Sequence, residues 1–483
     1  MRAVLATALI AAAGILPAPA LAHGFAVRYQ LPLPLGYYLS AAAMAVALSF
    51  AAFALFARAP AARLFVTQLV ISPPPGFWLG GLFGALGVGL FVLVLATGLF
   101  GVQSPLHNLA PAFVWILWWV GLAYVCVLFG DLWALVNPWA TLAFWVERLC
   151  RRRLGVWRYP ERLDLWPAVG LFLMFAWLEL IWPGRERPAA LAAAIIGYSA
   201  ITFAGMAAFG RDIWLRRGEA FSIASALLAR FAPIARAANG DSLVLRPYAL
   251  GLAEKGPQSP AMTAFVLTML ATVSFDGLLA TPAWAGLKAM IFATPALAPA
   301  LFALERLTGD VHGTLATVAL IGLPLLFAAV YLGVAALVAR LDASIGRAGS
   351  GAPGAVLIAR HFVMSLVPIA IAYHLAHYLS FLMIAGQVLI ALISDPFGFG
   401  WDLFGTAGRR LDVGVINARV VWYVAISAIV AGHMIAVYLA HLAALRLFGE
   451  RRRANLSQIP MVALMVVYTT LSLWILAQPV VAD

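Results

Sequence analysis

Two histidines three residues apart, His374 and His377, stand in a long apolar stretch of this sequence. On a helix, residues three apart lie on one face about one turn from each other, so both imidazoles can reach one metal ion. Two acidic residues, Glu179 and Asp276, lie in other apolar stretches. Ionisable side chains are costly inside a bilayer and are functional candidates wherever they occur there. These four residues are therefore the first candidates for a site.

The chemistry that these residue types favour is metal binding with acid–base assistance. Imidazole and carboxylate groups suit zinc, copper, iron or manganese, and we expect a divalent metal, zinc or copper. The alternative is that the polar groups pair with one another, or with carbonyls near Pro368 and Gly386, and lock helices together. The predicted metal ligands are His374, His377, Asp276, His433 and His23, and the predicted catalytic acid–base residues are Glu179 and Asp395.

Two of these histidines carry hypotheses of their own. If a signal peptide is cleaved after Ala22, His23 becomes the mature N-terminus, and its amine and imidazole form a chelate that suits copper. Cleavage elsewhere would remove this site. His433 lies deeper in a later apolar run, and together with His377 it could supply the two facing ligands of a haem.

The elements that must position these residues are membrane-spanning helices. Of the 483 residues, 64% are apolar and 10% are charged, against about 25% charged in typical soluble domains. So few charges could not cover a soluble surface, which excludes a soluble globular enzyme and a disordered protein and makes a lipid bilayer the expected partner. The net charge of +12 is explained by basic cytoplasmic loops, not by nucleic acid, and the two cysteines give no disulfide framework.

The chain divides into a signal peptide and one all-α domain. Residues 1–22 have a basic start, an apolar core and the cleavage pattern Ala20-Leu21-Ala22. Residues 23–483 are expected to form a polytopic helical domain with ten runs long enough to cross a bilayer core of about 30 Å. The predicted spans are 37–56, 77–100, 109–129, 165–183, 189–210, 261–281, 314–339, 356–379, 420–445 and 459–477.

Three apolar stretches are not predicted to be single membrane-spanning helices. The stretch 132–147 is expected as an interfacial helix, and 285–304, which contains two prolines, as a re-entrant or surface segment. The stretch 355–393 is too long for one span, and we expect one span followed by a re-entrant or interfacial piece that breaks near Gly386. Gly76, Gly80 and Gly84, at four-residue spacing, predict a close helix–helix contact.

The basic residues set the orientation. With the mature N-terminus outside, 22 of the 31 lysines and arginines fall in inner loops, including the long connection 211–255, and 8 fall on the outer side. This is the positive-inside asymmetry. We therefore expect a multi-pass protein of the bacterial inner membrane, with both termini in the periplasm and with Glu179, Asp276, His374 and His377 in its outer half.

Several strings together resemble a bacterial family of polytopic membrane proteins named fenitrothion hydrolase. The resemblance covers nearly the whole chain after residue 22, and residues 395–406 are its most specific part. It implies hydrolysis of an organophosphate, an aryl phosphotriester, with release of a nitrophenol; it carries no catalytic residue set. The strings lie at 23–25, 31–34, 129–133, 137–139, 274–277, 376–378, 394–406 and 431–433.

Two classes of function follow. As a hydrolase, the protein would use an outer-facing metal-bound water to attack phosphorus, with Glu179 or Asp395 as base or orienting group. As a transporter of a metal ion, copper for example, or of a small molecule, it would use the same polar groups as a relay or ion site. A haem-binding redox subunit is a further alternative. In each case residues 395–406 are expected as an outer loop folded over the site, or as an interfacial aromatic anchor.

The charge distribution gives a testable topology. A reporter fused after Asp483 should be active only if it is of a type that works in the periplasm, because ten crossings return the chain to its starting side. Activity of a cytoplasmic reporter there would mean that the stretch 355–393 crosses twice.

Overall fold

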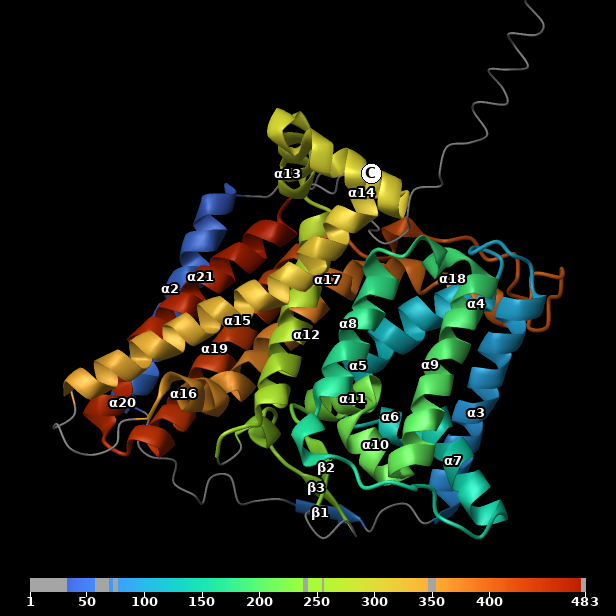
Figure 1. Ribbon diagram of the computed structural model, residues 1–483, viewed down its shortest axis with the longest axis horizontal. Helices are drawn as coiled ribbons and strands as arrows, with labels where there is room; N and C mark the ends of the chain where they lie inside the picture. The colour runs from blue at the N-terminus through green and yellow to red at the C-terminus, as the bar shows by residue number, and fades with distance from the viewer. Residues whose placement is uncertain are drawn as a thin grey trace, which may run out of the picture.

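The fold was analysed in a computed structural model that describes residues 33–56, 69–72, 77–237, 242–253, 256–345 and 353–478. The predicted signal peptide, His23 and Gly76 lie outside these residues. Within them the chain is almost entirely helical, as predicted from its composition, with one small antiparallel sheet in the order β1-β3-β2 (Figure 1). The strands are β1 (Leu69–Ser72), β2 (Ile234–Arg236) and β3 (Leu243–Leu245).

The helices follow the apolar runs of the sequence. They are α2 (Leu35–Phe56), α3 (Phe77–Phe100), α4 (Leu109–Ala112), α5 (Leu122–Leu128), α6 (Trp133–Val136), α7 (Pro138–Leu149), α8 (Trp166–Leu180), α9 (Pro188–Phe209), α10 (Arg211–Arg217), α11 (Ala220–Ala229), α12 (Pro260–Leu279), α13 (Pro282–Ala293), α14 (Ala298–Thr308), α15 (Val311–Ile345), α16 (Ala355–Phe362), α17 (Val367–Ala385), α18 (Val388–Ser394), α19 (Ala418–Phe448), α20 (Arg451–Ser457) and α21 (Ile459–Leu476). A π-helical segment, Phe113–Gly121, joins α4 to α5.

Nine helical runs among the described residues are long and apolar enough to cross a membrane. They correspond to nine of the ten predicted spans. The remaining one, 165–183, is the shorter helix α8 of 15 residues, about 22 Å long at 1.5 Å per residue. Helix α8 packs against α11 and α12.

The apolar stretches interrupted by proline or glycine form bent or broken helices, as predicted. Helix α13 and the following helical piece meet at an angle of 75° and project from the upper end of the bundle in Figure 1. The stretch 132–147 forms two short helices, α6 and α7, rather than a span. The run from Ala355 continues to Ala385, and the short helix α18 follows the break at Gly386.

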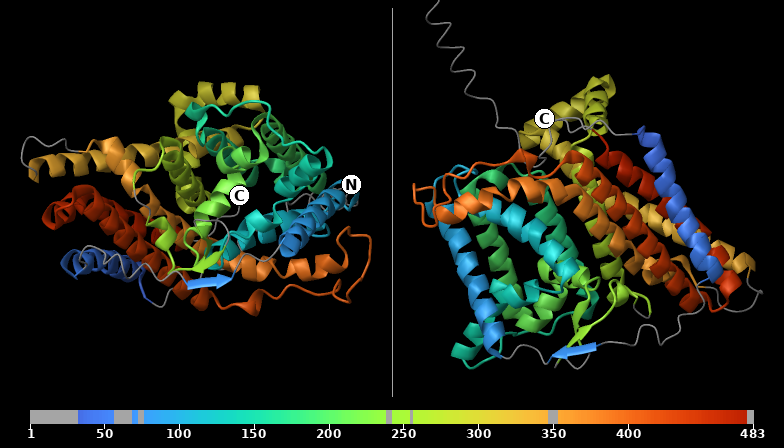
Figure 2. Two further views of the ribbon diagram at one scale, coloured as in Figure 1. Left: turned by 90° about the horizontal axis from the view of Figure 1, so that it is seen from below. Right: turned by 180° about the vertical axis from the view of Figure 1, so that it is seen from behind.

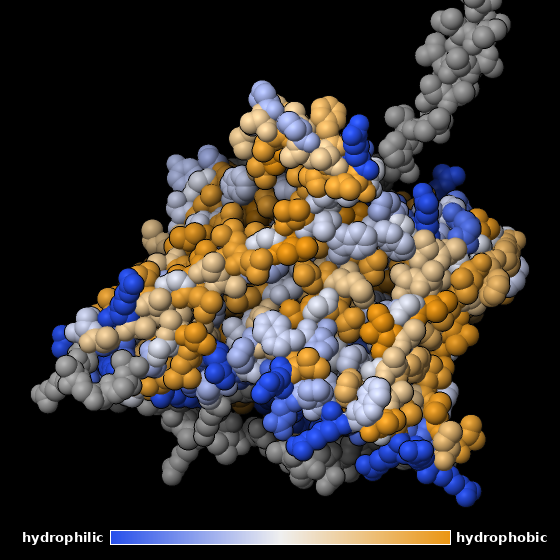
Figure 3. All heavy atoms as spheres, in the orientation of Figure 1, coloured by the Kyte–Doolittle hydropathy of each residue, from blue (hydrophilic) through white to orange (hydrophobic). Residues whose placement is uncertain are grey.

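The apolar surface and the charged ends agree with a bilayer environment. Figure 3 shows apolar residues over the middle of one face, with hydrophilic residues gathered toward the lower and upper ends. Helix α2 begins and helix α21 ends at the upper end, and α2 lies beside α19 and α21 in both Figure 1 and Figure 2. At the lower end, Arg451 donates hydrogen bonds to the carbonyls of Ala54 and Leu55, which closes the C-terminus of α2.

Glycines bring α3 into close contact with the α6–α7 pair. A Cβ on Gly87 would lie 1.9 Å from the carbonyl oxygen of Val136, and one on Gly84 would lie 2.7 Å from the hydroxyl of Thr141. Gly80 faces open space. Of the predicted glycines, Gly84 makes the close contact and Gly80 does not, and the contact continues one turn further along α3 at Gly87.

The connection 211–255 is not simply a loop, as the sequence analysis expected. Helix α10 packs back along α9, and α11 is inserted beside α5, α6 and α8. Between them, Glu219 bonds to Tyr198, eleven residues before the end of α9, which is a depth of about 16 Å. Residues 211–229 thus form a re-entrant helical hairpin, hidden from hydropathy because α11 is only 10 residues long.

The buried carboxylate of Glu219 holds the turn of this hairpin. The residue is 0% exposed. One carboxylate oxygen accepts from the Tyr198 hydroxyl at 2.5 Å and from the Phe221 backbone N–H at 2.9 Å, and the other accepts from the Ser222 N–H at 2.7 Å. Glu219 therefore satisfies two of the unpaired N–H groups that begin α11.

Replacing Glu219 should destabilise the protein strongly. Glu219→Ala leaves three buried donors without a partner, each worth about 1–3 kcal/mol, so the thermal unfolding temperature of the purified protein should fall clearly. Asp212→Asn, on the exposed side of α10, is the matched control and should leave it unchanged. An equal, small effect of both substitutions would contradict the role of Glu219.

Candidate functional site

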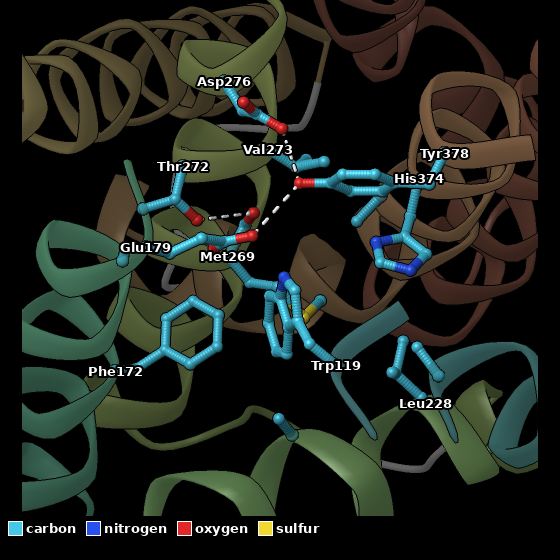
Figure 4. A pocket seen from close by; sticks show the side chains of 14 residues that line it. Trp119, Phe172, Glu179, Leu228, Met269, Thr272, Val273, Asp276, His374 and Tyr378 are labelled. Carbon is cyan, nitrogen blue, oxygen red and sulfur yellow. Dashed lines mark hydrogen bonds between the residues drawn. The ribbon is translucent and has the colours of Figure 1, made fainter. Parts of the chain in front are cut away.

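A small cavity inside the bundle is lined by two acidic and three aromatic residues, among others (Figure 4). It encloses about 60 Å³, enough for a few water molecules. Its walls come from five places: the π-helical segment with α5, α8, α11, α12 and α17. The lining includes Trp119, Phe172, Glu179, Ala224, Leu228, Thr272, Asp276, Ala370, His374 and Tyr378.

A chain of hydrogen bonds links three helices at one end of this cavity. The Tyr378 hydroxyl on α17 lies 2.5 Å from Oδ2 of Asp276 on α12 and 3.3 Å from Oε1 of Glu179 on α8. Oδ2 of Asp276 also lies 2.9 Å from Nε2 of His377. The side chains of His377 and Asp276 are only 8% and 15% exposed. Figure 4 shows the tyrosine hydroxyl between the two carboxyl groups.

The protons in this chain can be assigned from the number of donors. Tyr378 has one hydroxyl hydrogen, and the shorter contact gives it to Asp276. Tyr378 can then bond to Glu179 only by accepting a hydrogen, which requires a protonated Glu179. Two carboxylates this close in a buried site would also repel each other. The arrangement therefore favours one shared, exchangeable proton across Glu179, Tyr378 and Asp276.

The C-terminal ends of α8 and α12 hold the two acids of this hydrogen-bond chain. Glu179 is one residue from the end of α8, where the Arg185 guanidinium donates to the carbonyls of Glu179 and Leu180. Asp276 lies three residues before the end of α12. Both acids are therefore near the upper end of the bundle in Figure 1, which the basic residues predict to be the outer end.

His374 faces the cavity but does not join the chain. Its ring packs on Tyr378, with centroids 4.7 Å apart, and on Tyr124 at 5.7 Å. Nε2 of His374 is buried and has no hydrogen-bond partner among the residues that the structure describes. His374 lines the cavity, so water inside it is the natural partner for this nitrogen.

The predicted metal site is not assembled by the described residues. They contain no group of three or more histidine, cysteine, aspartate or glutamate side chains placed to hold a metal ion. His377 and Asp276, which the sequence placed in one site, lie within hydrogen-bond distance, and the Tyr378 hydroxyl lies between Asp276 and Glu179. His433 does not line the cavity, and its Nδ1 donates to the carbonyl of Ile429 at 2.8 Å.

Asp395 is also placed apart from the cavity. Its carboxylate accepts from the backbone N–H groups of Phe399 and Gly400, at 2.9 and 2.7 Å, and so shapes its own loop. This loop packs on residues 102–109 through two backbone hydrogen bonds, from Val102 to Phe397 and from Leu109 to Pro396. The segment 395–406 is thus a loop with exposed aromatic residues, as expected, but it does not contribute to the cavity walls.

Two residues of the site escaped the sequence analysis. Nothing in the sequence marks Tyr378 as a site residue, although it lies four residues after His374 and on the same helix face. Trp119 sits in the π-helical segment, and π-helical turns often occur at functional sites. No residue pattern in the sequence predicts a π-helical turn.

Comparison of the chain with protein-family models, curated proteins and solved structures finds no match. The function must therefore be argued from the site itself.

The shared proton makes a prediction that chemical labelling can check. Dicyclohexylcarbodiimide reacts with protonated carboxyl groups in apolar surroundings, so it should modify Glu179 or Asp276, as detected by mass spectrometry. Tyr378→Phe should increase the labelling rate, because loss of the donated hydrogen bond favours the protonated carboxyl. The exposed Asp402 serves as control and should stay unlabelled. Absence of any adduct on Glu179 and Asp276 would contradict a shared proton.

Proposed function

We propose that this chain is a proton-coupled transporter of a small molecule or metal ion in the bacterial inner membrane, and that Glu179 and Asp276 carry the coupling proton. The observation that carries this proposal is the Tyr378 hydroxyl lying between the two carboxyl groups inside the helix bundle. Buried ionisable groups in membrane bundles mark ion pathways and proton relays.

The surroundings of the acid pair support proton exchange. The pair lies near the end of the bundle that the basic residues predict to face the periplasm, so a proton from that side has a short way to travel. The cavity continues from the acids toward α11 and has the unpaired Nε2 of His374 on its wall. Water there would extend the hydrogen-bonded chain toward the middle of the membrane.

Hydrolysis of an aryl phosphotriester, implied by the family resemblance, stays a prediction. The cavity of about 60 Å³ is much smaller than the ~300–1,000 Å³ of typical small-molecule sites. The helices around it would have to separate to admit such a substrate. A transport cycle that moves only a proton through this region needs no such space.

Charge movement after a pH step tests the proposal directly. With the protein reconstituted on a solid-supported membrane, a step to lower pH on the outer side should displace positive charge inward as the acids take up protons. In the Glu179→Gln/Asp276→Asn variant the displaced charge should fall to about a tenth or less, because amides cannot bind the proton. Glu186→Gln, an exposed carboxylate at the same end, is the matched control and should behave as wild type.

Two outcomes would overturn the proposal. One is a wild-type protein, correctly inserted, that displaces no charge after the pH step. The other is a Glu179→Gln/Asp276→Asn variant that displaces as much as wild type. Turnover of a chromogenic phosphotriester by a protein that displaces no charge would favour the hydrolase instead.

A further inference from the structure

A second polar cluster lies on the opposite side of α12 from the cavity, among α12, α17, α19 and α21. Its core is the contact of Ser274 with Tyr468, whose hydroxyl oxygens are 2.5 Å apart. Ser274 donates to the carbonyl of Leu270, so the hydrogen between the two residues comes from Tyr468. The oxygen of Tyr468 therefore keeps lone pairs to accept a hydrogen bond from another donor.

Two further polar atoms of this cluster are buried and unpaired within the described part of the chain: the hydroxyl of Tyr373 and Nε2 of His433. Both residues are 0% exposed. A buried polar atom without a partner costs about 1–3 kcal/mol. Two of them beside the Ser274–Tyr468 contact therefore indicate a bound polar ligand that the protein alone does not supply.

The atoms of the cluster follow one another from Asp276 toward the middle of the membrane. The ring of Tyr373 stacks on that of His377 with centroids 6.0 Å apart, His377 in turn bonds to Asp276, and the Tyr373 hydroxyl occupies the space left by the missing side chain of Gly277. The ring of His433 lies 6.0 Å from that of Tyr468, and Ser472 is one helical turn from Tyr468. The cluster is thus continuous with the acid pair.

The tautomer of His433 suits the end of a proton path. Its Nδ1 lies 2.8 Å from the Ile429 carbonyl, and a carbonyl can only accept, so Nδ1 carries the hydrogen. In the neutral ring Nε2 is then a bare acceptor, and it is the atom without a protein partner. His433 can therefore take up a proton at Nε2.

From this geometry we infer that the cluster is a water-binding site that conducts protons between Asp276 and His433. Ordered waters bridge the hydroxyls of Tyr373, Tyr468 and Ser472 and the Nε2 of His433. In each transfer an oxygen accepts one hydrogen as it releases another. The proton that leaves the carboxyl of Asp276 is thereby matched by one that binds Nε2, giving an imidazolium. This inference rests on the proposed function, since it extends the path of the same proton.

The depths of Asp276 and His433 determine how much the displaced charge should change when the path is cut. Asp276 lies three residues, about 5 Å, inside the end of α12, whereas His433 lies fifteen residues, about 22 Å, inside α19. Displaced charge scales with the depth that the proton reaches. Cutting the path should therefore reduce the charge displaced by the pH step about four- to fivefold, while proton binding at Asp276 and Glu179 persists.

The experiment uses three substitutions that remove a hydroxyl or the basic nitrogen: Tyr373→Phe, Tyr468→Phe and His433→Gln. Each should lower the displaced charge without abolishing carbodiimide labelling of the acid pair. The matched control is Tyr331→Phe, a buried tyrosine on α15 whose hydroxyl bonds to the Ala359 carbonyl, and it should displace as much charge as wild type.

The outcomes separate this inference from the proposed function. If wild-type protein displaces charge and the three variants displace the same amount, the path does not run through this cluster, although the proposed function stands. If wild-type protein displaces none, the proposed function itself fails. Tyr373→Phe is informative even if the other two variants fail to insert, because its hydroxyl has no partner in the described protein whose loss would unfold the chain.

Discussion

A carboxyl group inside a helix bundle must accept a hydrogen bond or carry a proton. This requirement determines how the polar groups in the interior of this protein are arranged. Water is scarce there, and an unpaired carboxylate is more costly than most single packing defects. Each buried acid is accordingly met by a specific partner: Asp276 by Tyr378 and His377, Glu219 by backbone N–H groups and Tyr198, and Asp342 by the guanidinium of Arg453. The pair of Glu179 and Asp276 differs from the other two because the single Tyr378 hydroxyl lies between two carboxyl groups.

Helix α12 joins the two polar regions of the molecule. It packs against α8, α15, α17 and α21, and its side chains are buried along most of its length. Asp276 and Ser274 are two residues apart and so project in different directions. Asp276 meets α17 and the cavity, whereas Ser274 meets Tyr468 on α21. One helix thereby connects the acid pair with the cluster that ends at His433.

The re-entrant hairpin limits the space below the acid pair. Ala224 and Leu228 of α11 form part of the cavity wall, and Phe221 packs edge-on against Trp118 and Phe175 with ring centroids 4.5 and 4.8 Å apart. This tightly packed aromatic layer leaves room for a few waters and not for an organic substrate. It separates the acid pair from the lower end of the bundle, so charge that moves beyond this layer needs another route.

The sequence by itself determined the class of fold, the main spans and the polar residues that matter. Apolar runs and the scarcity of charge specify helices in a bilayer whatever their neighbours are, because each helix satisfies its own backbone. The break near Gly386, the bend in 285–304 and the pairing of His377 with Asp276 were read from residue types and depth alone. What only the tertiary structure decided is which polar groups meet. The Tyr378 hydroxyl lies between the two acids, Asp395 shapes a loop apart from the cavity, and residues 211–229 return into the bundle. These outcomes depend on how helices far apart in the sequence rotate and approach one another, and side-chain packing between them sets that, not the periodicity of any single segment.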